Sequence, residues 1–233
     1  MDILEPDHSV KHLGIIMDGN RRWAKENDLT SFKGHYHGYQ QLINIVKHAQ
    51  KIGIKVLTVF AFSSENWKRT PDEVTYLIGL FSESITEQSK ELIAENVRVR
   101  FIGEIGSFPE SLQKQMMDLT EQTKDFTGLT FNICASYGGR AEILNAIRTI
   151  HEKGIDPTTL TEDEFSNYLY TDGQPYPDMI IRTSGEQRLS NFLTWQNVYS
   201  ELYFADVHWP DFTPDELDKA IVEFSRRQRR FGK

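Results

Sequence analysis

The chain has 233 residues, a net charge of −8, a hydrophobic fraction of 39% and one cysteine, Cys134. A chain of this length can bury most of the apolar surface that its unfolded form exposes, so we expect a single domain without disulfides, in which Cys134 is a buried structural thiol. The acidic balance argues against a nucleic-acid-binding protein, and no apolar run reaches the ~20 residues of a membrane-spanning helix.

Residues 1–11 are expected to form a short N-terminal extension ahead of one domain over residues 12–233. They have neither the basic start nor the apolar stretch of a signal peptide, which predicts a cytoplasmic protein. Leu13–Met17 is a short apolar run typical of a buried strand, and the sequence Asp-Gly-Asn ends it in a loop.

Strands and helices alternate along the rest of the chain. Apolar residues at helical spacing predict a helix over residues 39–52. Thr70, Pro71 and Glu73 form a helix start with an N-cap and a capping box, ahead of a long helix ending near Asn96. The other expected strands are residues 54–62, 97–103, 129–135, 179–182 and 201–205, and the other expected helices are residues 109–124, 140–152 and 161–170.

This alternation predicts an α/β fold, in which a mainly parallel central sheet is flanked by helices on both faces. In open sheets of this kind, ligands bind beyond the carboxyl ends of the strands. The chemistry is therefore expected just after Met17, Phe62, Ala135 and Arg182.

The loop after the first strand carries charged and small residues suited to a diphosphate. Gly19 lets backbone N–H groups approach a ligand closely, and Arg21 and Arg22 supply planar forks of donors that match phosphate oxygens. Asp18 is an oxygen ligand suited to Mg²⁺, which takes one or two carboxylates plus substrate phosphates. Asp-Gly-Asn is also an ordinary turn sequence, so this loop alone does not decide the question.

Two further loops are polar. Residues 63–69 combine hydroxyls, an amide, a carboxylate and an arginine, which also fits a helix-capping loop, although Trp67 indicates a pocket wall or a lid. Residues 182–192 hold Arg182, Arg188 and Ser190 in a glycine-containing loop, a second candidate anion site. Two such loops and one acidic metal ligand indicate two diphosphate substrates side by side.

With these loops in order, the sequence resembles the cis-prenyltransferase family from about residue 12 to residue 232, in the manner of undecaprenyl diphosphate synthase. The segments that carry the resemblance share their order and compatible spacing with the family. They are His12–Asn20, Phe60–Trp67, Tyr137–Arg140, Ile181–Arg188, Ser190–Phe192, Trp195–Gln196, Glu201–Tyr203, Trp209–Asp211 and Arg229–Gly232.

The resemblance implies roles for residues in these segments. Asp18 would hold Mg²⁺ with Glu201 near the metal, and Asn66 would take part in proton removal. The allylic substrate, typically farnesyl diphosphate, would be bound by Gly19, Asn20, Arg21, Arg22, Trp23, His35 and Arg69. Isopentenyl diphosphate would be bound by Arg182, Arg188 and Ser190. The mobile loop between the two substrates would contain Ser63, Ser64, Glu65 and Trp67.

The same resemblance implies a homodimer that makes a cis-polyprenyl diphosphate, such as the undecaprenyl diphosphate used as a lipid carrier for cell wall glycans. The basic tail at residues 225–230 would lie at the dimer contact, or would be a solvated helix face or a peripheral membrane contact. The growing chain needs an apolar tunnel, although each candidate could equally be ordinary core. The tunnel candidates are Phe60, Phe62, Leu77, Ile78, Phe81, Ile85 and Phe131.

Product length and the preferred primer stay open, as does the effect of Arg21, Ser31 and Gln187, which depart from residues common in the family. Ser82 and Glu83 are polar positions of the long helix that could alter tunnel depth. The alternatives are a synthase of shorter chains, a noncatalytic subunit of the same fold, and an enzyme that couples two allylic units. The residues at Asp18, Arg22 and Asn66 argue against the noncatalytic subunit, and the late loop argues against the coupling enzyme.

Overall fold

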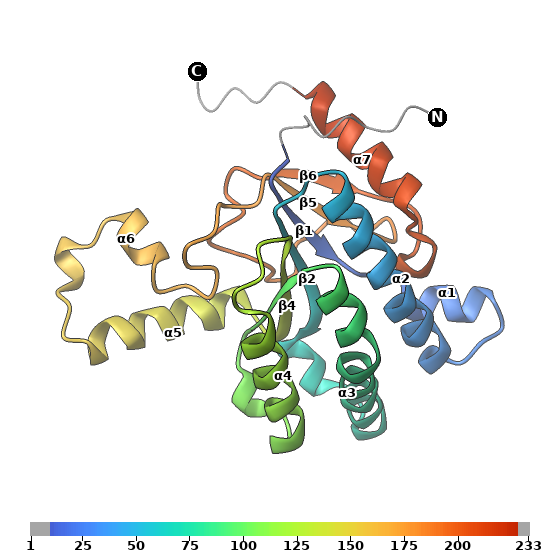
Figure 1. The fold of residues 1–233 in the computed structure, drawn as a ribbon, viewed down its shortest axis with the longest axis horizontal. Helices are drawn as coiled ribbons and strands as arrows, with labels where there is room; N and C mark the ends of the chain where they lie inside the picture. The colour runs from blue at the N-terminus through green and yellow to red at the C-terminus, as the bar shows by residue number, and fades with distance from the viewer. Residues whose placement is uncertain (1–9, 228–233) are drawn as a thin grey trace.

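A six-stranded sheet with the order β3-β4-β2-β1-β5-β6 forms the centre of the computed structural model, which describes residues 10–227 (Figure 1). Every pairing between neighbouring strands is parallel. The strands are β1 (His12–Ile16), β2 (Val56–Ser63), β3 (Arg98–Ile102), β4 (Thr130–Tyr137), β5 (Met179–Arg182) and β6 (Glu201–Phe204). The α/β fold predicted from the sequence is confirmed.

Seven α-helices and four 3-10 helices are described alongside the sheet. The α-helices are α1 (Asn20–Glu26), α2 (Ser31–Lys51), α3 (Pro71–Ala94), α4 (Glu110–Thr123), α5 (Gly139–Glu152), α6 (Glu162–Ser166) and α7 (Pro214–Arg226). The 3-10 helices are η1 (Ser64–Lys68), η2 (Ile105–Ser107), η3 (Pro157–Thr159) and η4 (Trp209–Asp211). No helix among residues 10–227 combines the length and the apolar character that crossing a bilayer requires.

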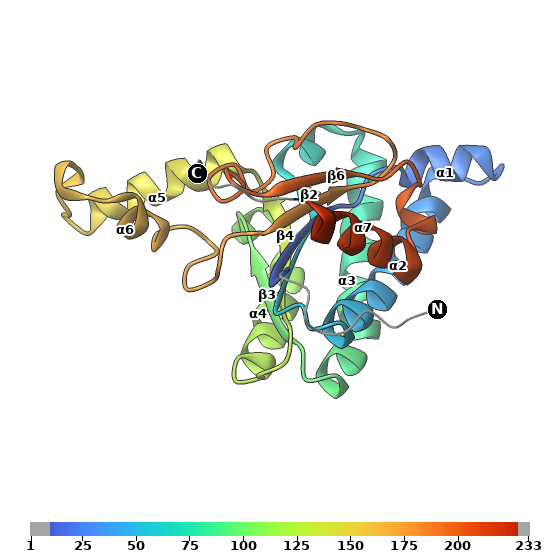
Figure 2. The ribbon, with the colours of Figure 1, turned by 90° about the horizontal axis from the view of Figure 1, so that it is seen from above.

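The two faces of the sheet are covered differently, which corrects the expectation of helices on both. Leu13 and Ile15 point into one core that also takes the buried side chains of α2, α3, α4 and α7. Ile16 and Ile180 point into a second, smaller core that is covered by the segments carrying Tyr170 and residues 189–193. Helices α5 and α6 extend away from the sheet instead (Figures 1 and 2). Because both faces are buried, β1 reads as a continuous apolar run rather than an alternating one.

Helix α1 was not predicted, and α2 begins eight residues before the predicted start at residue 39. Glycines lower helix propensity, so Gly34 and Gly38 hide the first turns of α2 from a sequence pattern. Both glycines are needed for packing, since a Cβ on Gly34 would lie 2.1 Å from the Asn20 carbonyl oxygen and one on Gly38 would lie 2.2 Å from Asn20 Oδ1. The glycines thus let α2 pack directly against the start of α1.

The predicted start of α3 is correct, but its capping box is only half formed. Thr70 Oγ1 accepts a hydrogen bond from the Glu73 backbone N–H at 3.4 Å. The Glu73 carboxylate turns away from the Thr70 backbone and accepts a hydrogen bond from Arg69 instead, at 2.7 Å. Glu73 therefore acts in the site described below rather than as a cap. The predicted helix over residues 161–170 is also shorter, since α6 spans only Glu162–Ser166.

Candidate functional site

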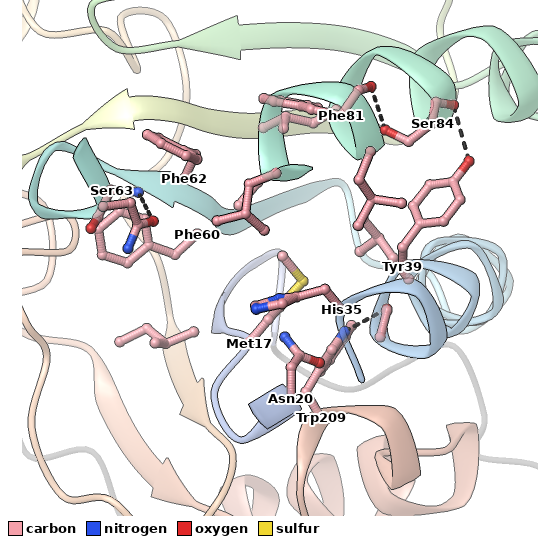
Figure 3. A pocket seen from close by; sticks show the side chains of 18 of the residues that line it. Met17, Asn20, His35, Tyr39, Phe60, Phe62, Ser63, Phe81, Ser84 and Trp209 are labelled. Carbon is pink, nitrogen blue, oxygen red and sulfur yellow. Dashed lines mark hydrogen bonds between the residues drawn. The ribbon is translucent and has the colours of Figure 1, made fainter. Parts of the chain in front are cut away.

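A cavity of about 370 Å³ lies between the sheet and helices α2 and α3, and it reaches the carboxyl ends of β1, β2 and β5 (Figure 3). Its polar wall includes Asp18, Asn20, His35, Ser63, Asn66, Arg69, Arg182 and Ser190. Its apolar wall includes Leu77, Leu80, Phe81, Ile85, Phe101, Leu119, Phe131 and Ile133. One cavity thus combines a charged part with a long apolar part, at the edge of the sheet that the sequence indicated.

Asp18 and Arg182 form the ion pair that joins the early and the late loops. Arg182 Nη2 donates to Asp18 Oδ2 at 2.6 Å, although the two residues are 164 positions apart in the sequence. The Arg182 side chain is only 6% exposed, and its Nη1 donates to the Arg188 carbonyl oxygen at 2.5 Å and to Ser190 Oγ at 2.8 Å. The predicted isopentenyl and allylic loops are therefore adjacent.

The environment of Asp18 favours its ionised form. Burial raises the pKa of the carboxyl group, but the hydrogen bond and charge of Arg182, the charge of Arg22 and the Gly19 N–H outweigh burial and hold the pKa below its usual value. The turn is also fixed from behind, because Thr183 Oγ1 donates to the Asp18 carbonyl oxygen at 2.6 Å and the Trp209 N–H donates to it at 3.0 Å. Asp18 thus presents a positioned, charged carboxylate at the cavity, suited to bind a metal ion.

Gly19 adopts a left-handed conformation, with φ at 104°. A Cβ there would lie 2.6 Å from Ser184 Oγ and 2.7 Å from His208 Nδ1. His208 Nδ1 is itself 2.6 Å from Ser184 Oγ, and its Nε2 is 3.1 Å from Glu26 Oε1. Glycine is required at this position for both backbone conformation and close packing.

A second group of charges surrounds Glu186 beside this ion pair. Arg22 Nη1 donates to Glu186 Oε1 at 2.6 Å, and Arg188 Nη1 donates to Glu186 Oε2. Arg22 also lies 3.3 Å from Asp18 Oδ1 through its Nη2 atom. The hydrogen bonds and charges of Arg188 and Arg22 lower the pKa of Glu186. Five residues therefore form one continuous charged cluster: Asp18, Arg22, Arg182, Glu186 and Arg188.

A third group of charges lies around Glu73, at the start of α3. Arg69 Nη1 is 2.7 Å from Glu73 Oε1, Arg21 Nη1 is 3.8 Å from the same oxygen, and His35 Nε2 is 4.0 Å from it. Burial, followed by the positive charge of Arg69, lowers the pKa of His35 to about 4. His35 is therefore neutral at neutral pH and faces a ligand as a hydrogen-bonding group, not as a cation.

Three buried polar atoms around the cavity have no hydrogen-bond partner within residues 10–227. They are Asn20 Oδ1, His35 Nε2 and Arg182 Nε. Buried polar atoms are nearly always satisfied in native proteins, so unsatisfied ones that line a single cavity indicate a polar ligand. The polar end of the cavity is therefore a candidate site for a polar ligand.

The segment after β2 forms η1 rather than an irregular loop. The Ser63 N–H donates to Asn66 Oδ1 at 2.8 Å, as part of a capping box that fixes the turn. Trp67 Nε1 donates to Ser136 Oγ at 2.9 Å, and its ring packs edge-on against Phe62 at 5.0 Å. Trp67 does not line the cavity but supports its wall from behind, and its place in a loop between the two substrates stays a prediction. Ser63 and Asn66 face the cavity directly.

Other predicted residues lie outside the main cavity. Trp23 does not line the cavity and packs on His37 of α2, with ring centroids 4.9 Å apart. Ser64 and Glu65 do not line the cavity, and the hydroxyl of Ser64 donates to the Glu65 carboxylate at 3.1 Å. Glu65 lines a neighbouring cleft that also contains Arg140, Ser63 and Ser190.

Glu201 does not lie near Asp18 within one chain, so the two predicted metal ligands do not meet there, and the role of Glu201 near a metal stays a prediction. Strand registers align Glu201 with Met179 on β5 and with Leu13 on β1, at the amino ends of these strands. Asp18 lies five residues beyond Leu13, about 16 Å away along the strand direction at ~3.3 Å per residue. Glu201 instead accepts a hydrogen bond from Arg227 Nη1 at 3.0 Å.

The residues present fit a magnesium ion of the kind that a substrate helps to bind. No group of three or more histidine, cysteine or acidic side chains that could hold a metal ion occurs within residues 10–227. A site built only from protein ligands is therefore not formed there. Asp18 is the carboxylate of this cluster that lines the cavity, and Mg²⁺ takes one or two carboxylates plus substrate phosphates.

The apolar end of the cavity fits most of the predicted tunnel. Phe60, Phe62, Leu77, Phe81, Ile85 and Phe131 all line the cavity, whereas Ile78 does not. Ser82 lies outside the cavity lining and donates from its Oγ to Gln115 on α4 at 2.8 Å. Cys134 is fully buried, and burial raises its pKa, so the prediction of a structural thiol is confirmed.

Sequence reasoning missed Glu73, Glu186, Thr183 and Trp209 as parts of the site. Trp209 Nε1 donates to the Gly38 carbonyl oxygen at 2.6 Å and so ties η4 to α2 next to Asn20. Glu186 and Trp209 belong to segments that carry the family resemblance. The sequence shows that these segments match the family, but it does not show which side chains they contact. Half of the basic tail, residues 228–230, lies outside the described residues, as does Arg229–Gly232.

Comparison with known proteins adds independent findings. A family model described as "Putative undecaprenyl diphosphate synthase" matches residues 16–232. An isoprenyl transferase of Clostridium perfringens is 47% identical over 99% of this chain and 92% of its own length. An isoprenyl transferase of Thermotoga maritima is 49% identical over 95% of this chain and 96% of its own length.

Two solved structures are similar in fold. Lavandulyl diphosphate synthase from Lavandula x intermedia, in complex with dimethylallyl diphosphate, has a TM-score of 0.93 at 34% identity, covering 97% of this chain and 99% of its own. A "probable undecaprenyl diphosphate synthase" from Campylobacter jejuni has a TM-score of 0.82 at 32% identity, with the same coverage of 97% and 99%. Both likenesses extend over the whole sheet and its helices.

Proposed function

Because the chain belongs to the undecaprenyl diphosphate synthase family of prenyltransferases, we propose that it condenses isopentenyl diphosphate with an allylic diphosphate. The proposed primer is farnesyl diphosphate and the proposed product is a cis-polyprenyl diphosphate, undecaprenyl diphosphate. The observation that carries the proposal is the pairing of Asp18 with Arg182, which joins two arginine-bearing loops beside one apolar cavity. Two diphosphates and a growing hydrocarbon chain require this combination.

The allylic diphosphate is assigned to the start of α1 and the residues around it. Asn20 and His35 line the cavity, and Arg69 lies with them, so their polar atoms can face the phosphate oxygens. Arg21 and Arg22 approach from α1, where both are exposed and already paired with carboxylates. These donors stabilise the negative charge that develops on the departing diphosphate. The hydrocarbon tail then extends along Leu77, Phe81 and Ile85.

Isopentenyl diphosphate is assigned to the late loop. Ser190 and the buried Arg182 line the cavity, while Arg188 is exposed at its edge and can turn toward the ligand. Asp18 is the residue proposed to hold Mg²⁺. A bound magnesium ion would supply charge neutralisation for the leaving diphosphate. Asp18 itself orients Arg182 through their 2.6 Å hydrogen bond.

Asn66 is proposed to act at the proton-loss step by orientation. Its Oδ1 already accepts from the Ser63 N–H, so its Nδ2 is the group that remains to donate to a phosphate oxygen. A neutral carboxamide cannot accept the proton at neutral pH, whereas a phosphate oxygen that Asn66 holds in place can. The new double bond would form as that proton leaves.

A second candidate function is the coupling of two allylic diphosphates. It is favoured by the TM-score of 0.93 to lavandulyl diphosphate synthase. The complete late loop, with Arg182, Arg188 and Ser190 beside Asp18, supports the isopentenyl reaction instead. The two reactions give chemically different products from the same assay.

We also propose that the chain is a cytoplasmic homodimer whose product supplies cell wall synthesis, with a peripheral membrane contact for product release. Exposed apolar side chains on α5 support an interface on that projecting helix, since Leu144 is 52% and Ile147 50% exposed. The oligomeric state is measured by light scattering. An Ile147→Asp variant is expected to be monomeric if this helix forms the contact.

The experiment for the main proposal incubates the protein with farnesyl and isopentenyl diphosphates and Mg²⁺. Product chain length and double-bond geometry are then read by mass spectrometry and NMR. Cis-polyprenyl diphosphates support the proposal. A parallel incubation with dimethylallyl diphosphate alone tests the coupling reaction. Absence of any elongated product under the first condition removes the main proposal.

A further inference from the structure

Two of the arginines proposed to bind diphosphate already hold an anion of the protein itself. The Glu186 carboxylate presents Oε1 to Arg22 Nη1 at 2.6 Å and Oε2 to Arg188 Nη1. Arg22 comes from α1 and Arg188 from the loop after β5. One carboxylate therefore bridges guanidinium groups from the two substrate loops, as an oxygen-rich ligand placed there would.

We propose that Glu186 is an internal competitor for the diphosphate, and that it sets the affinity of the late loop for diphosphates. This inference rests on the proposed function, because it assumes that Arg22 and Arg188 contact a diphosphate. When the two diphosphates are bound, their oxygens take the guanidinium groups of Arg22 and Arg188, and Glu186 turns outward. When the diphosphate leaves, Glu186 returns and satisfies both arginines.

The geometry allows this exchange. Glu186 follows Gly185, whose φ of 68° is in the left-handed region, and Ser184 before it has a φ of 77°. The Glu186 side chain is 29% exposed, so it can swing into solvent without leaving a buried charge. Arg188 is more exposed still, whereas Arg182 is buried and fixed by Asp18, Arg188 and Ser190. The mobile partners are thus those around Glu186, and Arg182 is the fixed part of the site.

The charges explain why a diphosphate can win this competition and still be released. A diphosphate carries more negative charge and more acceptor oxygens than a single carboxylate, so it forms more charge-assisted hydrogen bonds with the same forks. Glu186 is tethered next to the arginines and therefore acts at a high effective concentration. In repeated condensation, each cycle must bind one new diphosphate and release one. A tethered anion lowers the affinity of the site for both the substrate and the departing pyrophosphate.

Glu186→Gln tests the inference, because it keeps the size of the side chain and removes its negative charge. Direct binding of inorganic pyrophosphate is measured by calorimetry, with and without Mg²⁺, so the test needs no prenyl transfer. We expect Glu186→Gln to bind pyrophosphate about threefold to tenfold more tightly than the native chain, the range for loss of partly exposed charge pairs. In turnover, the KM for isopentenyl diphosphate should fall and inhibition by pyrophosphate should increase.

Glu91→Gln is the matched control. Glu91 is another partly exposed carboxylate, and its Oε2 lies 2.7 Å from Lys47 Nζ. Glu91→Gln therefore makes the same change in net charge at a position away from this cluster. Its pyrophosphate affinity should equal that of the native chain. Thermal melting of both variants checks that folding is intact.

Each outcome decides a different point. Native binding of pyrophosphate with equal or weaker binding by Glu186→Gln overturns the inference, because a structural or metal-binding role predicts weaker binding, not tighter. Equal tightening in Glu91→Gln also overturns it, since the effect would then be one of net charge. Failure of the native chain to bind pyrophosphate removes both the inference and the proposed diphosphate site.

Discussion

Replacing Asp18 by Asn tests the ion pair on which the site is built. The substitution keeps the side-chain shape and leaves Arg182, 6% exposed, without its charged partner. Arg182 retains the Arg188 carbonyl oxygen and Ser190 Oγ, so the loss should fall below the 3–5 kcal/mol typical of a broken buried pair. We expect a loss of about 2 kcal/mol of unfolding free energy, the scale of one hydrogen bond between charged groups.

For a chain of this size, each kcal/mol lowers the melting temperature by about 2–4 °C, so Asp18→Asn should melt about 4–8 °C below the native chain. Prenyl transfer should fall by about 100-fold or more, as when one group that stabilises transition-state charge is removed. Calorimetry and urea unfolding measure the first quantity, and initial rates measure the second. Asp118→Asn, at an exposed position of α4, is the control and should change neither.

The pH dependence gives a second test of the same pair. The pKa of Asp18 is lower in the folded chain than the ordinary aspartate value of 3.8, so the unfolded chain binds more protons just below that pH. The carboxylate therefore contributes stability above about pH 3.8, and the contribution is lost as the pH falls through the folded pKa. The gap between the native chain and Asp18→Asn should narrow toward low pH. Equal stability of the Asp18 and Asp118 variants at neutral pH would refute the reasoning.

Three further outcomes follow from the packing. Gly38→Ala should destabilise the fold by about 1–3 kcal/mol and reduce turnover, because its Cβ would lie 2.2 Å from Asn20 Oδ1. Gly79→Ala is the control, because a Cβ there has no atom within 4 Å, and it should stabilise the fold by up to about 1 kcal/mol. Urea unfolding measures both free energies. Ile85→Trp fills the apolar end of the cavity and should shorten the products seen by mass spectrometry; unchanged lengths would place the chain elsewhere. The Cys134 thiol should resist alkylation until the chain unfolds, since it is fully buried; rapid labelling of the native chain would contradict this.

Most of the fold was predictable because it depends on local patterns. Apolar runs bounded by turn residues gave the strands, and the start of α3 followed from Thr70 and Pro71. The first turns of α2 were missed, because Gly34 and Gly38 have low helix propensity and are needed there for close packing against Asn20. The loop segments that cover the second face were also not predicted. The amphipathic pattern of α5 predicts a helix, but it does not show that this helix extends away from the sheet.

The site was predictable where it depends on the position of a residue along a strand. Asp18 and Arg182 each follow a strand end, so the parallel sheet brings both to the same edge. Glu201 begins its strand, and the amino end of a parallel strand faces the opposite edge, so Glu201 lies away from Asp18 within one chain. The roles of Glu73 and Glu186 depend on side-chain pairing between distant segments, which no spacing rule contains.

The sequence by itself determined the succession of strands and helices along the chain, the family resemblance, and the polar residue types at each strand end. These are local properties of short segments. Only the tertiary structure decided which of those polar groups meet. Asp18 reaches Arg182 across 164 residues, and Glu186 occupies two arginines that the sequence had assigned to substrates. Charges interact through distances of a few ångströms in space, and those distances exist only once the sheet has formed.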